Sequence, residues 1–163
     1  MTSLKDQLES YGAYHRDPRN KLTHFVGVPL VTFSLFLLLS WFRFAPAPDW
    51  PITGATLFFL IVLLYYLRLD WPVALLQAPL NLVLLGLADR AALLPFRESL
   101  TIFLATFVGG WIFQLLGHAI EGRRPALADN LLQIFNAPLF LTVEVLFLFG
   151  LRQDLREARA EPA

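Results

Sequence analysis

The chain has 163 residues, of which 56% are hydrophobic and only 16% are charged, and its mean hydropathy is +0.57. An ordinary soluble domain is roughly 45–50% apolar and about 25% charged, so this composition predicts an integral membrane protein. Thirteen basic and thirteen acidic residues cancel, which excludes the broad basic surface of a nucleic-acid-binding protein. The absence of cysteine excludes disulfides and thiolate ligands, so any metal must be held by nitrogen and oxygen atoms.

The first 24 residues are mostly polar or charged, and apolar runs follow at 25–42, 54–69, 73–88, 100–119 and 131–151. The first run is longer than a signal-peptide core of roughly 7–15 residues, so we expect a retained span. The third run is short and carries Gln77, Pro79 and Asn81, which predict a tilted, kinked or partly re-entrant helix. The other four runs are expected to be long enough to cross a bilayer.

These runs predict an all-α fold, an integral membrane helical bundle of four to five transmembrane helices. No internal repeat or long linker divides the chain, so we expect residues 1–163 to form one domain. Basic residues before the first span predict, by the positive-inside tendency, a short cytoplasmic N-terminal segment. They are Lys5, Arg16, Arg19 and Lys21.

The last run, 131–151, leaves two alternatives open. A fifth crossing would place Arg152, Arg156 and Arg159 outside, against the positive-inside tendency, unless the neighbouring acidic residues override it. Alternatively the run is a re-entrant hairpin, for which the sequence 136–138, Asn-Ala-Pro, offers a break.

Glu144 lies in the middle of this last run. A carboxylate at that depth is costly unless it is protonated or paired. We expect a structural polar contact with Gln77, Asn81 or Asn136 in preference to a catalytic role.

All three histidines lie in polar clusters at the edges of apolar runs, His15 and His24 before the first and His118 at the end of the fourth. Imidazole binds cations and costs free energy to bury unused, so this placement indicates a metal site at the membrane surface. Four crossings would bring His24 and His118 to one side of the membrane, whereas three would separate them. Asp17 followed by Pro18 predicts a helix that begins at Pro18, and His15 can then fold back towards His24.

In the second cluster Gln114, His118 and Glu121 share one helical face at i, i+4 and i+7. The His-x-x-Glu spacing is similar to that of paired metal ligands in helical bundles. Glu121 is expected either to ligate the metal or to accept the second ring N–H of a ligating histidine. Taken singly, each histidine is more often a solvated or hydrogen-bonded residue; their grouping is what favours the metal site.

The basic residues beside both clusters have two interpretations. In the first they anchor the protein to lipid headgroups. In the second they form, together with the amide of Asn20, a docking site for a substrate carboxylate. The residues of this candidate substrate site are Asn20, Arg19, Lys21, Arg123 and Arg124.

The two clusters together resemble the signature of the Mpo1-like family over nearly the whole chain. The residues that carry the resemblance are Tyr14, His15, Asn20, His24, Gly27 and Pro29, followed by Gln114, Gly117, His118, Glu121, Pro125 and Ala126. The resemblance implies an Fe(II)-dependent dioxygenase that removes one carbon as CO₂ from 2-hydroxy fatty acids, an alpha-oxidation in lipid or sphingoid-base metabolism. It carries over His15, His24 and His118 as iron ligands, whereas a catalytic role for Glu121 and a substrate-binding role for Asn20 are our own inference.

The same resemblance implies a 2-hydroxy fatty acid and O₂ as substrates. It also implies membrane lipids as the surroundings, with a homo-oligomer left open. A bacterial inner membrane is expected, or the endoplasmic reticulum if the chain is eukaryotic. Two other functions remain: a metal-dependent lipid hydrolase that uses the same histidines with Glu121 as general base, and a non-enzymatic membrane scaffold or transporter.

Overall fold

The fold is built almost entirely from α-helices, so the all-α class expected from the sequence is confirmed. The computed structural model describes residues 3–12, 15, 17–45, 52–122 and 134–160. Within them β1 (Arg43–Ala45) and β2 (Ile52–Thr53) form a short antiparallel ribbon. The helices of the described residues are α1 (Leu4–Gly12), α2 (Pro18–Ser40), α3 (Gly54–Leu69), α4 (Trp71–Ala91), α5 (Phe96–Glu121), α6 (Asn136–Leu148) and α7 (Gln153–Ala160).

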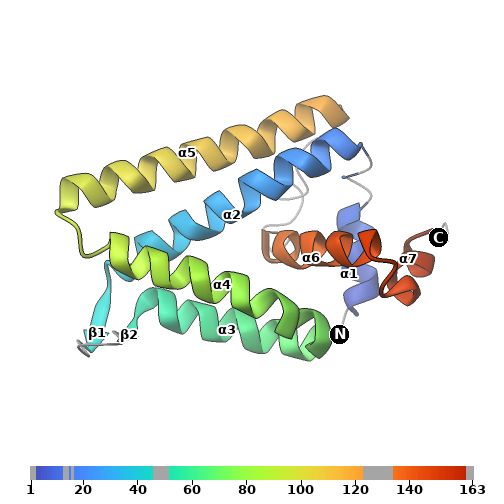
Figure 1. The fold of residues 1–163 in the computed structure, drawn as a ribbon, viewed down its shortest axis with the longest axis horizontal. Helices are drawn as coiled ribbons and strands as arrows, with labels where there is room; N and C mark the ends of the chain where they lie inside the picture. The colour runs from blue at the N-terminus through green and yellow to red at the C-terminus, as the bar shows by residue number, and fades with distance from the viewer. Residues whose placement is uncertain (1–2, 13–14, 16, 46–51, 123–133, 161–163) are drawn as a thin grey trace.

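Consecutive helices from α2 to α5 run antiparallel (Figure 1). Their connections are short: Asp70 alone joins α3 to α4, and residues 92–95 join α4 to α5. We call the end that holds the start of α2, the α3–α4 turn and the end of α5 the histidine end, and the opposite end the far end. His24 and His118 therefore lie at the same end of the bundle.

Three of these helices, α2, α4 and α5, are long and apolar enough to cross a membrane. α3 has 16 residues and a length of about 24 Å, less than the roughly 30 Å hydrocarbon core of a bilayer. The run 54–69 is thus shorter than a comfortable span, contrary to expectation. The number of four to five crossings and the cytoplasmic N-terminus stay predictions.

Polar caps decide where the helices begin. Asp17 accepts a hydrogen bond from the backbone N–H two residues on at 2.8 Å, and Pro18 follows it, so the predicted start of α2 is confirmed. Asp70 caps α4 in the same way through the N–H of Val73 at 3.0 Å. α5 ends at Gly122, whose φ of +69° lies in the left-handed region that glycine tolerates.

The third apolar run, 73–88, lies within a helix that is longer than the run itself. α4 continues for 21 residues through Pro79 and is long and apolar enough to cross a membrane, so among the tilted, kinked and partly re-entrant alternatives the last is the least well supported. Gln77 and Asn81 are buried: Gln77 donates to Asn81 at 3.3 Å and accepts from Thr142 of α6. Because these polar groups bond to one another inside the protein, they do not face lipid and do not interrupt the helix.

The last apolar run does not cross the bundle in its described part. α6 has 13 residues, or about 20 Å, and begins beside the middle of α3, where Phe135 contacts Phe58 and accepts a hydrogen bond from Tyr66 at 2.7 Å. From there α6 runs to the histidine end (Figure 1). Of the two alternatives for 131–151, this geometry fits the re-entrant one, because Arg152 then stays at the end where α2 begins.

The N-terminal segment folds as α1 and packs against α6 and α7 at the histidine end. Leu4, Leu8 and Tyr11 recur at helical spacing and are buried in one apolar cluster with Phe140 of α6. This packing extends to His15, whose ring lies beside Tyr11 and Phe140.

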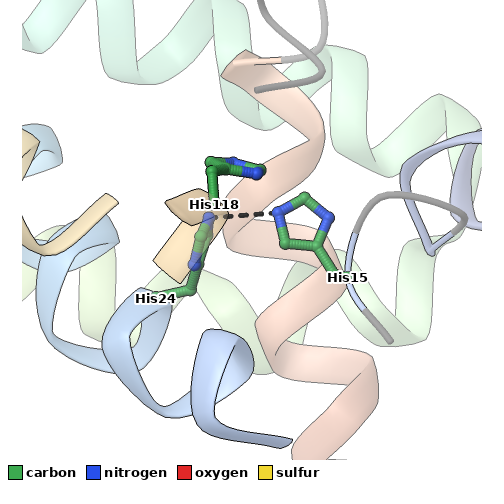
Figure 2. A group of neighbouring side chains, drawn as sticks. All are labelled: His15, His24 and His118. Atoms are coloured by element: carbon green, nitrogen blue, oxygen red, sulfur yellow. Dashed lines mark hydrogen bonds between the residues drawn. The ribbon is translucent and has the colours of Figure 1, made fainter. Parts of the chain in front are cut away.

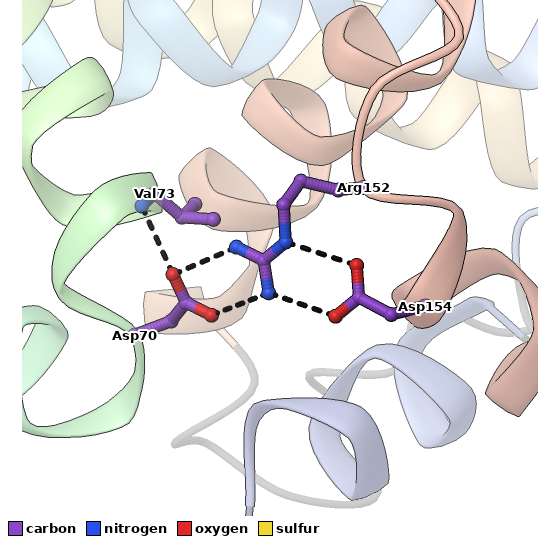
Figure 3. A network of polar contacts seen from close by, with 4 residues as sticks. All are labelled: Asp70, Val73, Arg152 and Asp154. Carbon is purple, nitrogen blue, oxygen red and sulfur yellow. Dashed lines mark hydrogen bonds and ion pairs between the residues drawn. The ribbon is translucent and has the colours of Figure 1, made fainter.

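An ion-pair network ties the end of α6 to the α3–α4 turn (Figure 3). The guanidinium of Arg152 donates to both carboxylate oxygens of Asp70 at 2.9 and 2.7 Å and to Asp154 at 3.1 Å. These hydrogen bonds raise the pKa of Arg152 above its ordinary value, and those with Asp70 have the larger effect. Arg152 has a φ of +55°, which is unfavourable for a non-glycine residue, so the network holds a strained backbone in place.

Replacing Arg152 with alanine is expected to lower the thermal unfolding temperature of the purified protein. The variant loses charge-assisted hydrogen bonds, which contribute roughly 1.5–3 kcal/mol each where they are shielded from water. Arg156→Ala, at an exposed position of α7, is the matched control and should leave the temperature unchanged. Equal unfolding temperatures of both variants in one detergent would show that the network contributes nothing.

Candidate metal centre

The three histidines of the chain meet at the histidine end (Figure 2). His15 comes from the segment between α1 and α2, His24 from the second turn of α2, and His118 from the last turn of α5. One ring nitrogen from each lies within 4.8 Å of the others, and the three residues are at most 6% exposed. The structure therefore brings together, in the protein interior, the side chains that the sequence assigns to one site.

Backbone carbonyl groups fix the tautomers of two of the rings. Nδ1 of His15 lies 2.8 Å from the carbonyl oxygen of Tyr11, and Nδ1 of His24 lies 2.9 Å from the carbonyl oxygen of Asn20. A carbonyl oxygen can only accept, so Nδ1 of each ring must carry a proton. In the neutral rings Nε2 is therefore a bare lone pair, the form in which imidazole binds metals.

These two bare nitrogens face each other, with Nε2 of His15 3.0 Å from Nε2 of His24 (Figure 2). Two lone pairs at this distance repel unless a proton or a metal cation neutralises them. A proton is disfavoured, because burial lowers the pKa of His15 to about 3. A metal ion fits, since two imidazole nitrogens that share one ion at about 2.1 Å each lie at most about 4.2 Å apart.

His118 offers the third nitrogen. Its Nδ1 is buried and has no hydrogen-bond partner among the residues that the structure describes. Its ring centroid lies 4.9 Å from that of His15 and 5.0 Å from that of His24. A buried nitrogen without a partner costs free energy that a bound cation would offset. Three neutral imidazoles suit iron, zinc, copper or nickel and not the oxygen-binding ions magnesium and calcium.

Glu121 binds the start of α2. Its Oε2 accepts from the backbone N–H of Asp17 at 2.8 Å and from Nδ2 of Asn20 at 3.0 Å. The ring N–H groups of His15 and His24 bond instead to backbone carbonyls, so Glu121 is not the acceptor for these two rings. Among the described residues it also lies outside the group of possible metal ligands. Glu121 and Asn20 thus position His24, whose ring bonds to the Asn20 carbonyl.

The close approach of α2 and α5 beside the cluster requires glycine. A Cβ atom at Gly117 would overlap the side chain of Asn20 and lie 3.1 Å from Nδ1 of His24. Farther along the same contact, a Cβ at Gly27 would lie 2.9 Å from the carbonyl oxygen of Gly110. Small residues at both positions let the two backbones pack closely, which brings His118 to His24.

Two aromatic residues that hold His15 were missed from the sequence. The Tyr11 ring stacks on the imidazole, with centroids 4.1 Å apart and planes 8° apart, and the Phe140 centroid lies 5.5 Å away. Tyr11 could have been found from the sequence, because it continues the apolar spacing of Leu4 and Leu8 and lies four residues before His15. Nothing in the local sequence marks Phe140, which comes from a distant part of the chain.

The structure describes part of the candidate substrate site. Arg19 is exposed and pairs with Asp17 at 2.9 Å. Arg123 and Arg124 lie outside the described residues, as does Arg16. Arg19 therefore stands on the surface beside the cluster and does not enter it.

Lys21 pairs with Glu144 at 2.8 Å, and both side chains are largely buried. The partner of this carboxylate is thus a lysine of α2, where Gln77, Asn81 or Asn136 was expected. The expectation assumed that Glu144 lies at the centre of the membrane. Because α6 ends at the histidine end, Glu144 lies close to the first turn of α2 instead.

Comparison with known proteins assigns the family. Residues 1–148 match the family model Mpo1-like, described as 2-hydroxy-palmitic acid dioxygenase Mpo1-like. The chain belongs to the Mpo1-like family. It is also 36% identical over 159 residues to the 2-hydroxy-palmitic acid dioxygenase MPO1 of Saccharomyces cerevisiae, a match that covers 96% of this chain and 87% of the yeast protein. No solved structure matches the chain significantly.

The region matched by the Mpo1-like model contains His15, His24 and His118 as well as Asn20 and Glu121. The whole cluster therefore lies in the part of the chain that the family shares. The resemblance stated from the two sequence motifs is confirmed by the family model and by the yeast relative.

In this Mpo1-like chain, Gly117→Ala is expected to lower metal affinity about 10–100-fold, the usual effect of disturbing the residues that support metal ligands. The added methyl group displaces Asn20 and with it His24. Gly109→Ala on the same helix is the control, because a Cβ there meets nothing within 4 Å. Competition with a coloured chelator measures the affinity, and circular dichroism checks the helix content. Equal affinities in two folded variants would contradict the expectation.

Proposed function

We propose that the chain is a non-haem Fe(II)-dependent dioxygenase that removes one carbon as CO₂ from 2-hydroxy fatty acids. One observation carries the proposal: the facing lone pairs of His15 and His24, with His118 beside them, need a cation. The substrate class follows from the yeast relative, which is named a dioxygenase of 2-hydroxy-palmitic acid.

The reaction balances without a further reductant. A 2-hydroxy acid, R–CH(OH)–COOH, and O₂ give R–COOH, CO₂ and H₂O. The bond between C1 and C2 breaks, C1 leaves as CO₂, C2 becomes the carboxyl carbon of the shortened acid, and O₂ accepts all of the electrons. A bound Fe(II) ion would supply the dioxygen chemistry that no amino-acid side chain provides.

The protein residues hold and orient this site. His15, His24 and His118 are the proposed ligands, and among the described residues no fourth ligand joins them, which leaves positions for substrate. The carbonyls of Tyr11 and Asn20 hold two of the rings in the metal-binding tautomer. Burial of the cluster keeps bulk water away from the reacting groups.

The histidine end also supplies positive charge for the substrate carboxylate. Arg19 and Lys21 lie on the first turn of α2, and we propose that they attract this group together with Arg123 and Arg124, which follow α5 in the sequence and lie outside the described residues. We assign to Asn20, whose side-chain amide donates to Glu121, the role of positioning His24. The proposed location is a bacterial inner membrane, or the endoplasmic reticulum in a eukaryotic cell, with the histidine end on the cytoplasmic side.

The alternative of a lipid hydrolase is less well supported by the contacts. It requires Glu121 as a general base, whereas Oε2 of this residue accepts two hydrogen bonds from the start of α2. A scaffold with structural histidines leaves the repulsion between His15 and His24 unexplained.

Purified protein loaded anaerobically with Fe(II) is expected to convert 2-hydroxypalmitate into pentadecanoate and CO₂ when oxygen is admitted. An oxygen electrode and mass spectrometry should find equal amounts of O₂ consumed and CO₂ released. Palmitate, which lacks the 2-hydroxyl group, is the matched control and should not react. Turnover of a lipid ester by the zinc-loaded protein under argon, with no loss of carbon, would support the hydrolase instead.

Each of His15→Ala, His24→Ala and His118→Ala is expected to abolish detectable Fe(II) binding and turnover, because each removes one of three ligands. Helix content by circular dichroism should not change. Gln77→Ala removes an equally buried polar side chain outside the cluster and should retain iron. If all three histidine variants keep iron and activity, this ligand set is wrong.

A further inference from the structure

The three histidines are buried too deeply for an ion to reach them without some movement of the protein. None of His15, His24 and His118 is more than 6% exposed. A metal site needs a path by which the ion enters. At least one of the three segments that carry the histidines must therefore open, and the packing of these segments differs.

Two of the segments pack too tightly to be the part that opens. α2 and α5 lie against each other along their length (Figure 1). Their backbones come so close that a Cβ atom at Gly27 would lie 2.9 Å from the carbonyl oxygen of Gly110, and one at Gly117 would overlap the side chain of Asn20. Separating the two helices would break this whole close-packed interface, so His24 and His118 keep their positions.

α1 is less firmly attached. It has nine residues, fewer than the roughly 12–15 that an isolated helix needs to be even marginally stable in water, so it is helical only while it is docked. Leu4, Leu8 and Tyr11 are its buried apolar residues, and an exposed hydrogen bond between Gln7 and Tyr65 of α3 adds little. Burial of three side chains gains a free energy of the same order as the conformational entropy lost by ordering nine residues. The docking of α1 is therefore finely balanced.

His15 shifts this balance in either direction. Its ring meets α2 and α5, with its centroid 4.5 Å from that of His24 and 4.9 Å from that of His118. Without a cation, the facing Nε2 lone pairs of His15 and His24 push the segment away from α2 (Figure 2). A shared cation replaces this repulsion by bonds to both rings. Tyr11 links His15 to α1, because its ring stacks on the imidazole and its carbonyl oxygen accepts from Nδ1.

We propose that α1 is a lid over the metal centre and that its docking depends on the ion. In the metal-free protein α1 separates from α6 and α7 and leaves His24 and His118 open to an incoming ion. When all three histidines share the ion, α1 docks and the cluster is buried. Leu8 is then a positioning residue, which acts on the ion through His15. The inference rests on the histidine ligands of the proposed function and not on its oxygen chemistry, so the redox-inert ion Zn(II) can test it.

Hydrogen–deuterium exchange of the full-length protein in detergent, with and without Zn(II), measures the docking of α1. The amides of α1 are expected to exchange about tenfold more slowly, or slower still, when Zn(II) is bound, because undocked α1 loses its helical hydrogen bonds. The amides of the β1–β2 ribbon at the far end should exchange at the same rate in both states. In His15→Ala the exchange of α1 should no longer respond to Zn(II).

Zn(II) affinity provides the reciprocal measurement. If docking and metal binding are coupled, a variant that weakens docking must also weaken binding of the ion. Leu8→Ala removes a buried side chain from α1 and is expected to lower the affinity for Zn(II) about tenfold. Glu9→Ala, at an exposed position of the same helix, is the matched control and should bind Zn(II) as the wild type does.

The lid is excluded if the α1 amides of a protein that binds Zn(II) are protected equally with and without the ion, or if Leu8→Ala binds Zn(II) with unchanged affinity. The exchange measurement on the wild type needs no substitution, so it holds even where a variant does not fold. A wild-type protein that binds no metal would overturn both the lid and the proposed ligand set. Zn(II)-dependent protection of α1, without oxygen-dependent turnover of a 2-hydroxy acid by the Fe(II)-loaded protein, would retain the lid and exclude the dioxygenase.

Discussion

The repulsion between two imidazole lone pairs, held 3.0 Å apart in the protein interior, is the interaction on which the site depends. Both rings could avoid it by releasing their backbone partners, yet each keeps Nδ1 bonded to a carbonyl. Such an unfavourable contact persists only when the surrounding packing determines it, and contacts of this kind are concentrated at functional sites. A cation between the rings turns the repulsion into attraction. Burial disfavours a proton on His15 and so keeps the ring neutral, which is the form of imidazole that ligates a metal ion.

The packing that imposes this contact comes from three separate elements. α1 is held against α6 and α7 by its apolar stripe and delivers His15. α5 approaches α2 through glycine and delivers His118, while Glu121 ties the end of α5 to the start of α2. An ion bound by all three histidines would connect α2, α5 and the segment that follows α1. Because it binds the folded arrangement and not the unfolded chain, such an ion also stabilises the fold.

The sequence alone was sufficient for local features and for the grouping of the histidines. Asp17 and Pro18 mark a helix start through their own chemistry, and the lengths of the apolar runs predict an all-helical class. Hydropathy shows how long an apolar run is but not how far it extends into the helical bundle. The run 131–151 was therefore predicted as a possible span, and Glu144 was expected in the middle of the membrane. The partner of Glu144, Lys21, and the inward-facing pair Gln77 and Thr142 depend on which faces meet in the folded chain.

The short helix α6, which begins beside the middle of α3, lies next to both the histidine cluster and an apolar cavity. Its start, at Phe135 and Ala137, lines the cavity, and one turn later Phe140 packs beside His15. A helix that crossed the whole bundle at this position would occupy the space between α2 and α3 down to the far end. At the start of α6, Phe135 packs against Phe58, and both residues line this cavity together with Phe36 of α2. The short helix thus contributes both to the packing around the three histidines and to the wall of the neighbouring apolar cavity.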